Sequence, residues 1–399
     1  MKITRDSRIG VVGAGAMGSG IAQVAATYGH EVILHDTSSD SLERATKGIG
    51  TSLARFVEKG RITADEAARI EKRVQTVGGD GSDSSALDAF AECALIIEAV
   101  IENLEAKQDL FSRLESFLVE PAILATNTSS LSVTAIARAC AQPERVIGIH
   151  FFNPPTVLPL VEIVPGYVTS ADATAAAREI INAWGKTTVL ALDTPGFIVN
   201  RIARPFYGEA LRIYEEGIAS MATIDWAMRD IGGFKMGPFE LMDFIGNDVN
   251  FAATKAVYEG TFNDPRYKPT ITQQRLFEAG FLGKKTGRGY YDYREGAEQP
   301  EPDRDEELGT EIFSRILAML INEAADAVLF RIATPRDVDL AMTRGVNYPK
   351  GLLAWGEELG LHTVLARLEA LYNNYGEDRY RPSALLKRMV SERKSFFAD

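Results

Sequence analysis

Cysteine and histidine are scarce in this chain. Its 399 residues include two cysteines, Cys93 and Cys140, and four histidines. Two cysteines cannot form a disulfide framework, and they favour a reducing, cytoplasmic location. A cysteine-rich metal site is excluded for the same reason. Only His30 and His35 lie close together in the sequence, and the other two histidines are distant, so we expect no resident metal ion.

Positive charge is also in deficit, because 43 lysines and arginines stand against 55 aspartates and glutamates. The net charge is −12. Nucleic-acid binding needs a basic surface that neutralises phosphates, so we expect no nucleic-acid partner. Hydrophobic residues make up 46% and charged residues 25%, which is ordinary for a globular protein. At roughly 150 residues per domain, the length predicts two or three domains.

Long apolar segments are nearly absent. Residues 9–29 form an uncharged window that is long enough to span a bilayer, but they include six glycines with a better explanation. The N-terminus is charged and lacks the apolar segment of a secretory signal. We therefore expect neither a signal peptide nor contact with a membrane.

Short apolar runs alternate with helical patterns over residues 1–192, as parallel strands alternate with crossover helices. From Pro195 onward, long helical patterns replace them. The chain is therefore predicted to be a Rossmann-like α/β domain over residues 1–192, followed by an all-α region. The runs expected as strands are Arg8–Gly13, Val32–Asp36, Val74–Gly78, Leu95–Val100, Ala122–Thr126, Val146–Phe152, Leu160–Val164 and Thr187–Asp193.

The helical region contains an internal repeat. Residues 201–246 align without a gap with residues 315–360, at an offset of 114 and with 11 identities in 46 positions. An ungapped match of this length indicates a duplicated unit, although two hairpins of similar composition are the alternative. Between the copies, the segment 294–310 is acidic and has no aromatic residue. We predict helical units at 193–293 and 311–399, joined by a linker at 294–310.

A glycine-rich turn follows the first predicted strand. Gly13, Gly15 and Gly18 enclose Ala16 and Met17 at the start of a predicted helix. In this spacing the first glycine permits the tight turn, the second lets a pyrophosphate approach the backbone, and the third lets helix pack on strand. The N–H groups at the helix start would receive the phosphates. These five residues are predicted to bind a dinucleotide.

Asp36 ends the second predicted strand, 18 residues after Gly18. A carboxylate at this position can bind both ribose hydroxyls of an adenosine. The following Thr37-Ser38-Ser39 contains no arginine for a 2′-phosphate. The pattern favours NAD over NADP, and its alternatives are a flavin or a packing turn without a nucleotide.

A histidine and a glutamate flank a proline-rich loop. The segment 153–159 holds three prolines and is centred on Thr156. If the flanking strands pair as a hairpin there, His150 lies opposite Glu162 on the same face. A carboxylate beside an imidazole fixes its tautomer and favours its protonated form, as a general base requires. The alternative is a core histidine with a satisfied ring.

Two further polar segments are candidates for a ligand site. Asn127-Thr128-Ser129-Ser130 follows the fifth predicted strand, where such folds bind ligands, although serine and threonine there can also cap a helix. Asn200 follows a hinge-like Pro195-Gly196 turn and is either a cap or a substrate contact.

Taken together, these motifs resemble the L-3-hydroxyacyl-CoA dehydrogenases of fatty-acid metabolism (beta-oxidation) and aromatic-acid catabolism. The resemblance covers almost the whole chain, and the second helical unit is typical of fused and some phenylacetate-pathway members. The resemblance is to the 3-hydroxybutyryl-CoA and phenylacetate-pathway type with a duplicated C-terminal helical unit, whereas short members of the family have one such unit. The ending Tyr375–Ser383 looks most like the phenylacetate-pathway members. The most specific segments are Asn127–Ser130, His150–Pro154, Leu160–Glu162, Pro195–Arg201 and Leu282–Tyr291.

The resemblance implies an oxidoreductase that passes the C3 hydride of an acyl-CoA substrate to NAD⁺. His150 would be the general base and Glu162 its partner, while Ser129 and Asn200 would hold the substrate near the reacting carbons. The residues implied along the cofactor are Glu102, Lys107, Ser129, Asn153 and Lys285. In the family, the basic segment 41–73 lies beside CoA, but an ordinary charged helix pair explains its composition equally well.

Two other functions remain open at this point. One is a related dehydrogenase of a non-CoA 3-hydroxy acid or sugar acid, and the other is a catalytically silent, crystallin-like NAD-binding protein. We expect the second helical copy, which has Ser314 at the position of Asn200, to have no site of its own. It should cover the face through which short members dimerise, making a pseudo-dimeric chain that is a monomer or a homodimer.

Overall fold

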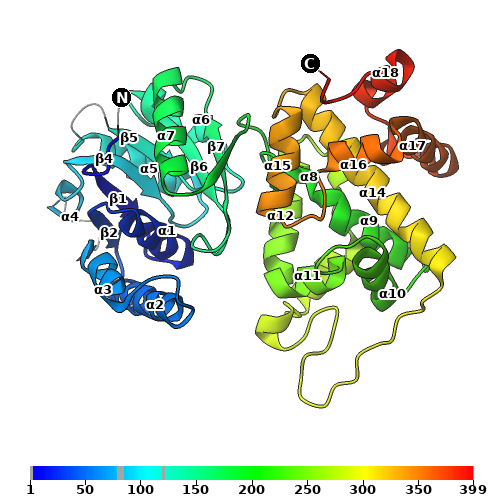
Figure 1. Ribbon diagram of the computed structural model, residues 1–399, viewed down its shortest axis with the longest axis horizontal. Coiled ribbons are helices and arrows are strands. Elements are labelled where there is room, and N and C mark those ends of the chain that lie inside the picture. The colour runs from blue at the N-terminus through cyan, green and yellow to red at the C-terminus, as the bar shows by residue number, and fades with distance from the viewer. Residues whose placement is uncertain (1–2, 79–84, 119–121, 399) are drawn as a thin grey trace. The chain divides into compact units, whose positions relative to one another are not determined.

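The structure, a computed structural model, describes residues 3–78, 85–118 and 122–398 (Figure 1). It divides into two compact units, Met1–Asp193 and Thr194–Asp399. The first unit is α/β and the second is helical, which confirms the predicted fold class. No helix in the described residues is both long and apolar enough to cross a membrane.

The first unit is built on an eight-stranded sheet with the order β3-β2-β1-β4-β5-β6-β7-β8. Neighbouring strands are parallel except for β6 and β7, which pair antiparallel. All eight predicted strands are confirmed to within two or three residues at their ends. Their bounds are β1 Arg8–Val12, β2 Val32–Asp36, β3 Val74–Gly78, β4 Cys93–Glu98, β5 Ile123–Thr126, β6 Val146–Phe151, β7 Leu160–Pro165 and β8 Thr187–Leu190.

Helices cover this sheet, so that its central strands are buried on both faces, as is usual for parallel sheets (Figure 1). Aliphatic side chains of β1, β2, β4 and β6 form the core together with α1 and α7. α2 and α3 pack on each other as a helical hairpin between β2 and β3. The helices are α1 Ala16–Thr27, α2 Ser39–Glu58, α3 Ala64–Lys72, α4 Ser85–Asp88, α5 Leu104–Glu115, α6 Val133–Ala137 and α7 Ala171–Ala183.

The second unit contains the two sequence copies as two sets of helices. The first set is α8 Val199–Ile202, α9 Arg204–Glu215, α10 Met221–Trp226 with the π-turn η2 Ala227–Ile231, α11 Pro238–Ile245, α12 Asn247–Gly260 and α13 Ile271–Glu278. The second set is α14 Glu306–Leu329, α15 Pro335–Gly345, α16 Leu352–Leu359, α17 Leu361–Tyr375 and α18 Ala384–Glu392. The order and lengths of the helices correspond from α10 to α13 and from α15 to α18.

An identical capping contact recurs in both sets and confirms the duplication. Asp225 accepts a hydrogen bond from Phe239 N at 2.9 Å, at the start of α11. At the equivalent position, Asp339 accepts one from Leu353 N at 2.8 Å, at the start of α16. In each set the aspartate stands in for a local N-cap side chain and satisfies an otherwise orphaned donor.

The two sets contact each other reciprocally where α8 and α9 pack against α14 (Figure 1). Arg201 Nε donates to Glu323 Oε1 at 2.9 Å, and Arg315 Nε donates to Glu209 Oε1 at 2.6 Å. Both arginines and both glutamates are related by the offset of 114. The arginine of each set thus contacts the glutamate of the other set. Such an exchange of equivalent contacts is the pattern that a two-fold axis produces.

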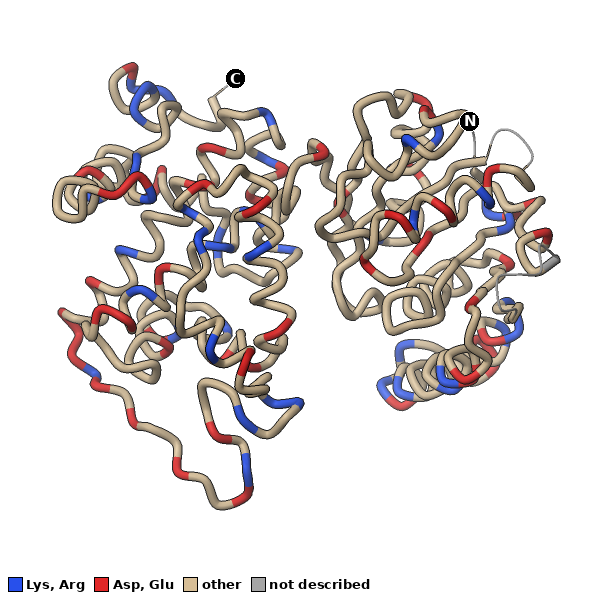
Figure 2. Tube along the Cα trace, turned by 180° about the vertical axis from the view of Figure 1, so that it is seen from behind, with Lys and Arg blue, Asp and Glu red and all other residues tan. Residues whose placement is uncertain are grey.

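The linker between the two sets is shorter than the sequence predicts. α14 begins at Glu306, so the last five residues of the expected linker 294–310 are helical. Asp305 caps this helix by accepting from Leu308 N at 2.9 Å. Two glutamates in the first turn also stabilise the helix, because their negative charge lies at the positive end of the helix dipole. Figure 2 shows the run of acidic residues along the preceding loop. The acidic composition therefore marks a helix start as well as a solvated loop.

Candidate active site

The glycine turn between β1 and α1 has the geometry of a dinucleotide cradle. Gly13 has a φ of 103°, and a Cβ there would lie 2.4 Å from Ala99 O. A Cβ on Gly18 would lie 1.7 Å from Gly13 O, so the helix can pack closely on the strand only with glycine. A Cβ on Gly15 would meet nothing within 4 Å. The backbone at the start of α1 is therefore open to a ligand, and these residues fit a bound pyrophosphate.

Asp36 is held beside this turn at the end of β2. Its Oδ2 accepts from Ala14 N at 2.7 Å, and its Oδ1 accepts from Ser38 N at 2.9 Å. A carboxylate has about four acceptor sites, so these two bonds orient it and leave capacity for ribose hydroxyls. The side chain thus has the position and the chemistry that the sequence predicts for an adenosine-binding acid.

His150 and Glu162 face each other across the antiparallel pair β6–β7. The observed register joins His150 to Glu162, which confirms the predicted hairpin pairing. His150 Nδ1 lies 2.6 Å from Glu162 Oε2, and the two residues are 5% and 0% exposed. The ring of Phe152 lies 4.5 Å from the imidazole, centroid to centroid. A buried carboxylate at this distance orients the imidazole and fixes which ring nitrogen faces away from it.

Glu102 organises the loop that carries Ser129. Its Oε1 accepts from Thr128 Oγ1 at 2.6 Å and from Ser129 N and Ser130 N at 3.1 Å each. Burial alone would raise the pKa of Glu102, but Lys107 and the hydroxyl donors outweigh it and lower that pKa. The carboxylate therefore stays ionised and fixes the backbone around Ser129, which is exposed. The cofactor contacts expected of Glu102 and Ser129 stay predictions.

Lys107 belongs to a buried ion pair that sequence reasoning missed. Its Nζ lies 2.5 Å from Glu98 Oε1 and 3.3 Å from Glu102 Oε2. Glu98 ends β4 and also accepts from Thr126 Oγ1, at 2.7 Å. The pair therefore ties β4, β5 and α5 together below the Ser129 loop. A charged residue at the end of an otherwise apolar strand was the available signal for Glu98.

Lys186 contacts the loop between β6 and β7. Its Nζ donates to the carbonyl oxygens of Pro155 and Leu158, the second at 2.8 Å. Burial lowers the pKa of Lys186 to about 8. Asn153, an implied cofactor contact, is exposed at the start of this loop. No motif distinguishes Lys186, and sequence reasoning missed it.

The residues of the first unit gather at one edge of the sheet. In the register, Val12 of β1 pairs with His35 of β2 and with Glu98 of β4, and Glu98 pairs with Thr126 of β5. The carboxyl ends of these strands are therefore level, and ligands of doubly wound sheets bind at such an edge. The glycine turn, Asp36, the Ser129 loop and His150 all follow these strand ends or lie close to them.

Two predicted site residues belong to the second unit. Asn200 lies in α8, half-buried, and its carbonyl oxygen accepts from Arg204 Nε at 2.7 Å. Lys285 Nζ lies 2.5 Å and 2.7 Å from the two carboxylate oxygens of Asp248.

Within the described ranges of the chain, no group of three or more His, Cys, Asp or Glu residues could hold a metal ion.

A glycine cradle, a ribose-type acid and a carboxylate-bound histidine at one sheet edge define a dinucleotide-dependent oxidoreductase. Comparisons with known proteins agree with this class. Residues 8–194 match the 3-hydroxyacyl-CoA dehydrogenase NAD binding domain. The C-terminal domain of the same family matches twice, at residues 196–293 and 312–395.

Individual relatives give the same result. The chain is 38% identical to the 3-hydroxyadipyl-CoA dehydrogenase of Escherichia coli K12, over 95% of this chain and 96% of that one. It is 41% identical to the human mitochondrial hydroxyacyl-coenzyme A dehydrogenase, over 71% and 90%. The crystal structure of an Escherichia coli 3-hydroxybutyryl-CoA dehydrogenase superposes with a TM-score of 0.89 at 37% identity, covering 97% and 98% of the two chains.

The chain belongs to the 3-hydroxyacyl-CoA dehydrogenase family. It is an enzyme that uses NAD to oxidise 3-hydroxyacyl-CoA to 3-ketoacyl-CoA. Of the functions that the sequence left open, family membership therefore supports the oxidation of an acyl-CoA substrate.

Proposed function

We propose that the chain oxidises the L enantiomer of its substrate with His150 as the general base. The observation that carries this proposal is the 2.6 Å contact between His150 Nδ1 and Glu162 Oε2. Because Glu162 engages Nδ1, the proton of the substrate C3 hydroxyl is taken at Nε2. Glu162 then stabilises the imidazolium that results. Bound NAD⁺ supplies the acceptor for the C3 hydride.

The substrate is held by Ser129 and Asn200 in this proposal. Ser129 suits the role because Glu102 fixes its loop with hydrogen bonds to Thr128, Ser129 and Ser130. The cofactor is held by the glycine turn and by Asp36, whose geometry fits a dinucleotide. Further cofactor contacts come from Glu102, Lys107, Ser129, Asn153 and Lys285.

The reaction is tested with purified protein and the two enantiomers of 3-hydroxybutyryl-CoA. Reduction of NAD⁺ is expected with the L enantiomer, and reverse reaction with acetoacetyl-CoA and NADH. Turnover of both enantiomers at equal rates would contradict the stereochemistry. Turnover that survives in Ser129→Ala would contradict the role of the Ser129 hydroxyl.

The substrate is further proposed to carry a second carboxylate. The support is the Escherichia coli relative with the printed name 3-hydroxyadipyl-CoA dehydrogenase, which matches nearly the full length of both chains. A panel of 3-ketoacyl-CoA esters with NADH tests this proposal. A higher kcat/KM for 3-ketoadipyl-CoA than for acetoacetyl-CoA is expected. The reverse order would assign the enzyme to short monocarboxylic chains.

The phosphates of CoA are proposed to lie beside the α2–α3 hairpin. Residues 41–73 hold eight basic and five acidic side chains, a local excess of positive charge in an acidic protein. Figure 2 shows both signs interspersed on this hairpin. Affinity for the CoA ester is therefore expected to fall with salt more steeply than affinity for acyl-pantetheine.

A cytoplasmic, reducing location completes the proposal, since Cys93 and Cys140 are both free and buried.

A further inference from the structure

The short helix that carries Asn200 depends on contacts outside itself. α8 spans four residues and has no side-chain N-cap. A single helical turn is unstable alone, because nucleation costs more than its one or two hydrogen bonds return. Arg201 N donates to Gly196 O at 3.1 Å, and Arg204 Nε donates to Asn200 O at 2.7 Å. These two bonds hold the backbone on the side of the first repeat.

A further anchor comes from the second repeat. Arg201, the residue after Asn200, donates from Nε to Glu323 Oε1 at 2.9 Å. Glu323 lies in α14 and is 1% exposed. The hydroxyl of Tyr267 also donates to its Oε1, and Arg266 lies 3.4 Å from its Oε2. Burial alone would lower the pKa of Arg201, but Glu323 outweighs it and raises that pKa.

We propose that Glu323 of the second repeat is a positioning residue of the active site, which holds Arg201 and thereby sets the orientation of Asn200. This proposal rests on the proposed role of Asn200 as a substrate contact. It assigns the second repeat a part in catalysis beyond packing. A displacement of about 1 Å at a positioning group can cost about a hundredfold in rate, so the loss of this anchor should be measurable.

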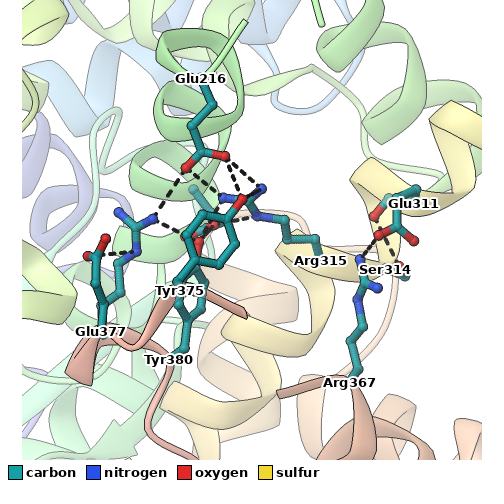
Figure 3. A network of polar contacts seen from close by, with 10 residues as sticks. Glu216, Glu311, Ser314, Arg315, Arg367, Tyr375, Glu377 and Tyr380 are labelled. Carbon is teal, nitrogen blue, oxygen red and sulfur yellow. Dashed lines mark hydrogen bonds and ion pairs between the residues drawn. The ribbon is translucent and has the colours of Figure 1, made fainter. Parts of the chain in front are cut away.

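The duplication supplies a matched control within the same chain. At the equivalent position Arg315 donates to Glu209 Oε1, and the hydroxyl of Tyr380 donates to the same oxygen at 2.6 Å. Figure 3 shows Arg315 in this network, beside Glu216 and Tyr380. The residue before Arg315 is Ser314, and its hydroxyl donates to Glu311 O within its own helix. This network therefore resembles the first in burial and charge but positions no proposed substrate contact.

The experiment compares Glu323→Gln with Glu209→Gln in the full-length chain. Both variants should lower the thermal unfolding midpoint, because Glu323 pairs with Arg201 and Arg266, and Glu209 pairs with Arg315. Glu323→Gln should lower kcat by about tenfold to a hundredfold with unchanged NADH affinity, and Glu209→Gln should stay within about threefold of wild type. The double variant Glu323→Gln with Asn200→Ala should be no slower than Asn200→Ala alone.

Equal losses of kcat in Glu323→Gln and Glu209→Gln would overturn the proposal, as would multiplicative effects in the double variant. Asn200→Ala with normal kinetics would instead overturn the proposed role of Asn200, and this proposal with it. If Glu323→Gln does not fold, Arg201→Lys and Arg315→Lys form a second matched pair. Lysine keeps the charge but loses the planar fork, and the same asymmetry in kcat is expected.

Discussion

Lys186 Nζ donates a hydrogen bond of 2.8 Å to the carbonyl oxygen of Leu158 and so joins the residue before β8 to the loop between β6 and β7. The two strands that this loop connects carry His150 and Glu162. Lys186 thus binds the turn of the antiparallel β6–β7 hairpin, the strands of which pair His150 with Glu162.

Lys186 gives a prediction on pH dependence. Burial lowers its pKa from the ordinary value of 10.5 to about 8. The unfolded chain therefore binds more protons between these values, so the free energy of unfolding rises with pH across that window. Thermal unfolding midpoints from about pH 7.5 to about pH 10 should show this contribution in wild type and not in Lys186→Met. An identical pH dependence of the two proteins would contradict it.

Removal of His150, the proposed base, should separate chemistry from cofactor binding. We expect His150→Gln to lower kcat by about two to three orders of magnitude, within the range for loss of a general base. Glu162→Gln should also be severe, because the imidazolium loses its charged partner. NADH affinity, measured by fluorescence titration, should stay at the wild-type value in both. Near-normal turnover in either variant would show that the pair is structural.

The cofactor preference should follow from Asp36. We expect a strong preference for NADH over NADPH, because a carboxylate that receives ribose hydroxyls repels a 2′-phosphate. Asp36→Asn should raise KM for NADH and reduce this preference in steady-state kinetics. Wild-type protein that used both cofactors equally well would disprove the assignment.

Deletion of residues 300–399 should expose the face of the first repeat that α14 covers. Arg201 would lose Glu323, and Glu209 would lose Arg315, so buried charges as well as apolar surface would meet water. We expect the truncated chain to aggregate or to dimerise through the exposed face. Light scattering distinguishes the outcomes, and a well-behaved monomer would contradict the pseudo-dimer.

The sequence predicts those features that depend on local pattern. Strand positions follow from apolar runs, and the pairing of His150 with Glu162 follows because a short loop leaves few possible registers. The repeat is visible because both copies keep the same spacing. In contrast, the contacts of Lys107 with Glu98, and of Glu102 with the Ser129 loop, join segments that only the folded sheet brings together. Such pairs leave no periodic signal, and neither does Lys186.

The helix start at Glu306 shows a different limit. The acidic composition around it is typical of a solvated loop, yet the same side chains cap a helix and complement its dipole. Composition alone therefore does not separate the two states. The long apolar pattern that follows favours the helix, because the buried face of α14 packs against α9.

The covalent joining of the two repeats also frees each half to diverge. In a homodimer of identical chains, every substitution at the interface occurs on both sides of the axis and must be compatible with itself. Here the two halves are separate stretches of one gene product, so each position changes once. Asparagine at position 200 and serine at position 314 illustrate the result, since one half has a candidate substrate contact that the other lacks. The symmetric contacts around Arg201 and Arg315 thus hold together two halves that differ at the position next to each arginine.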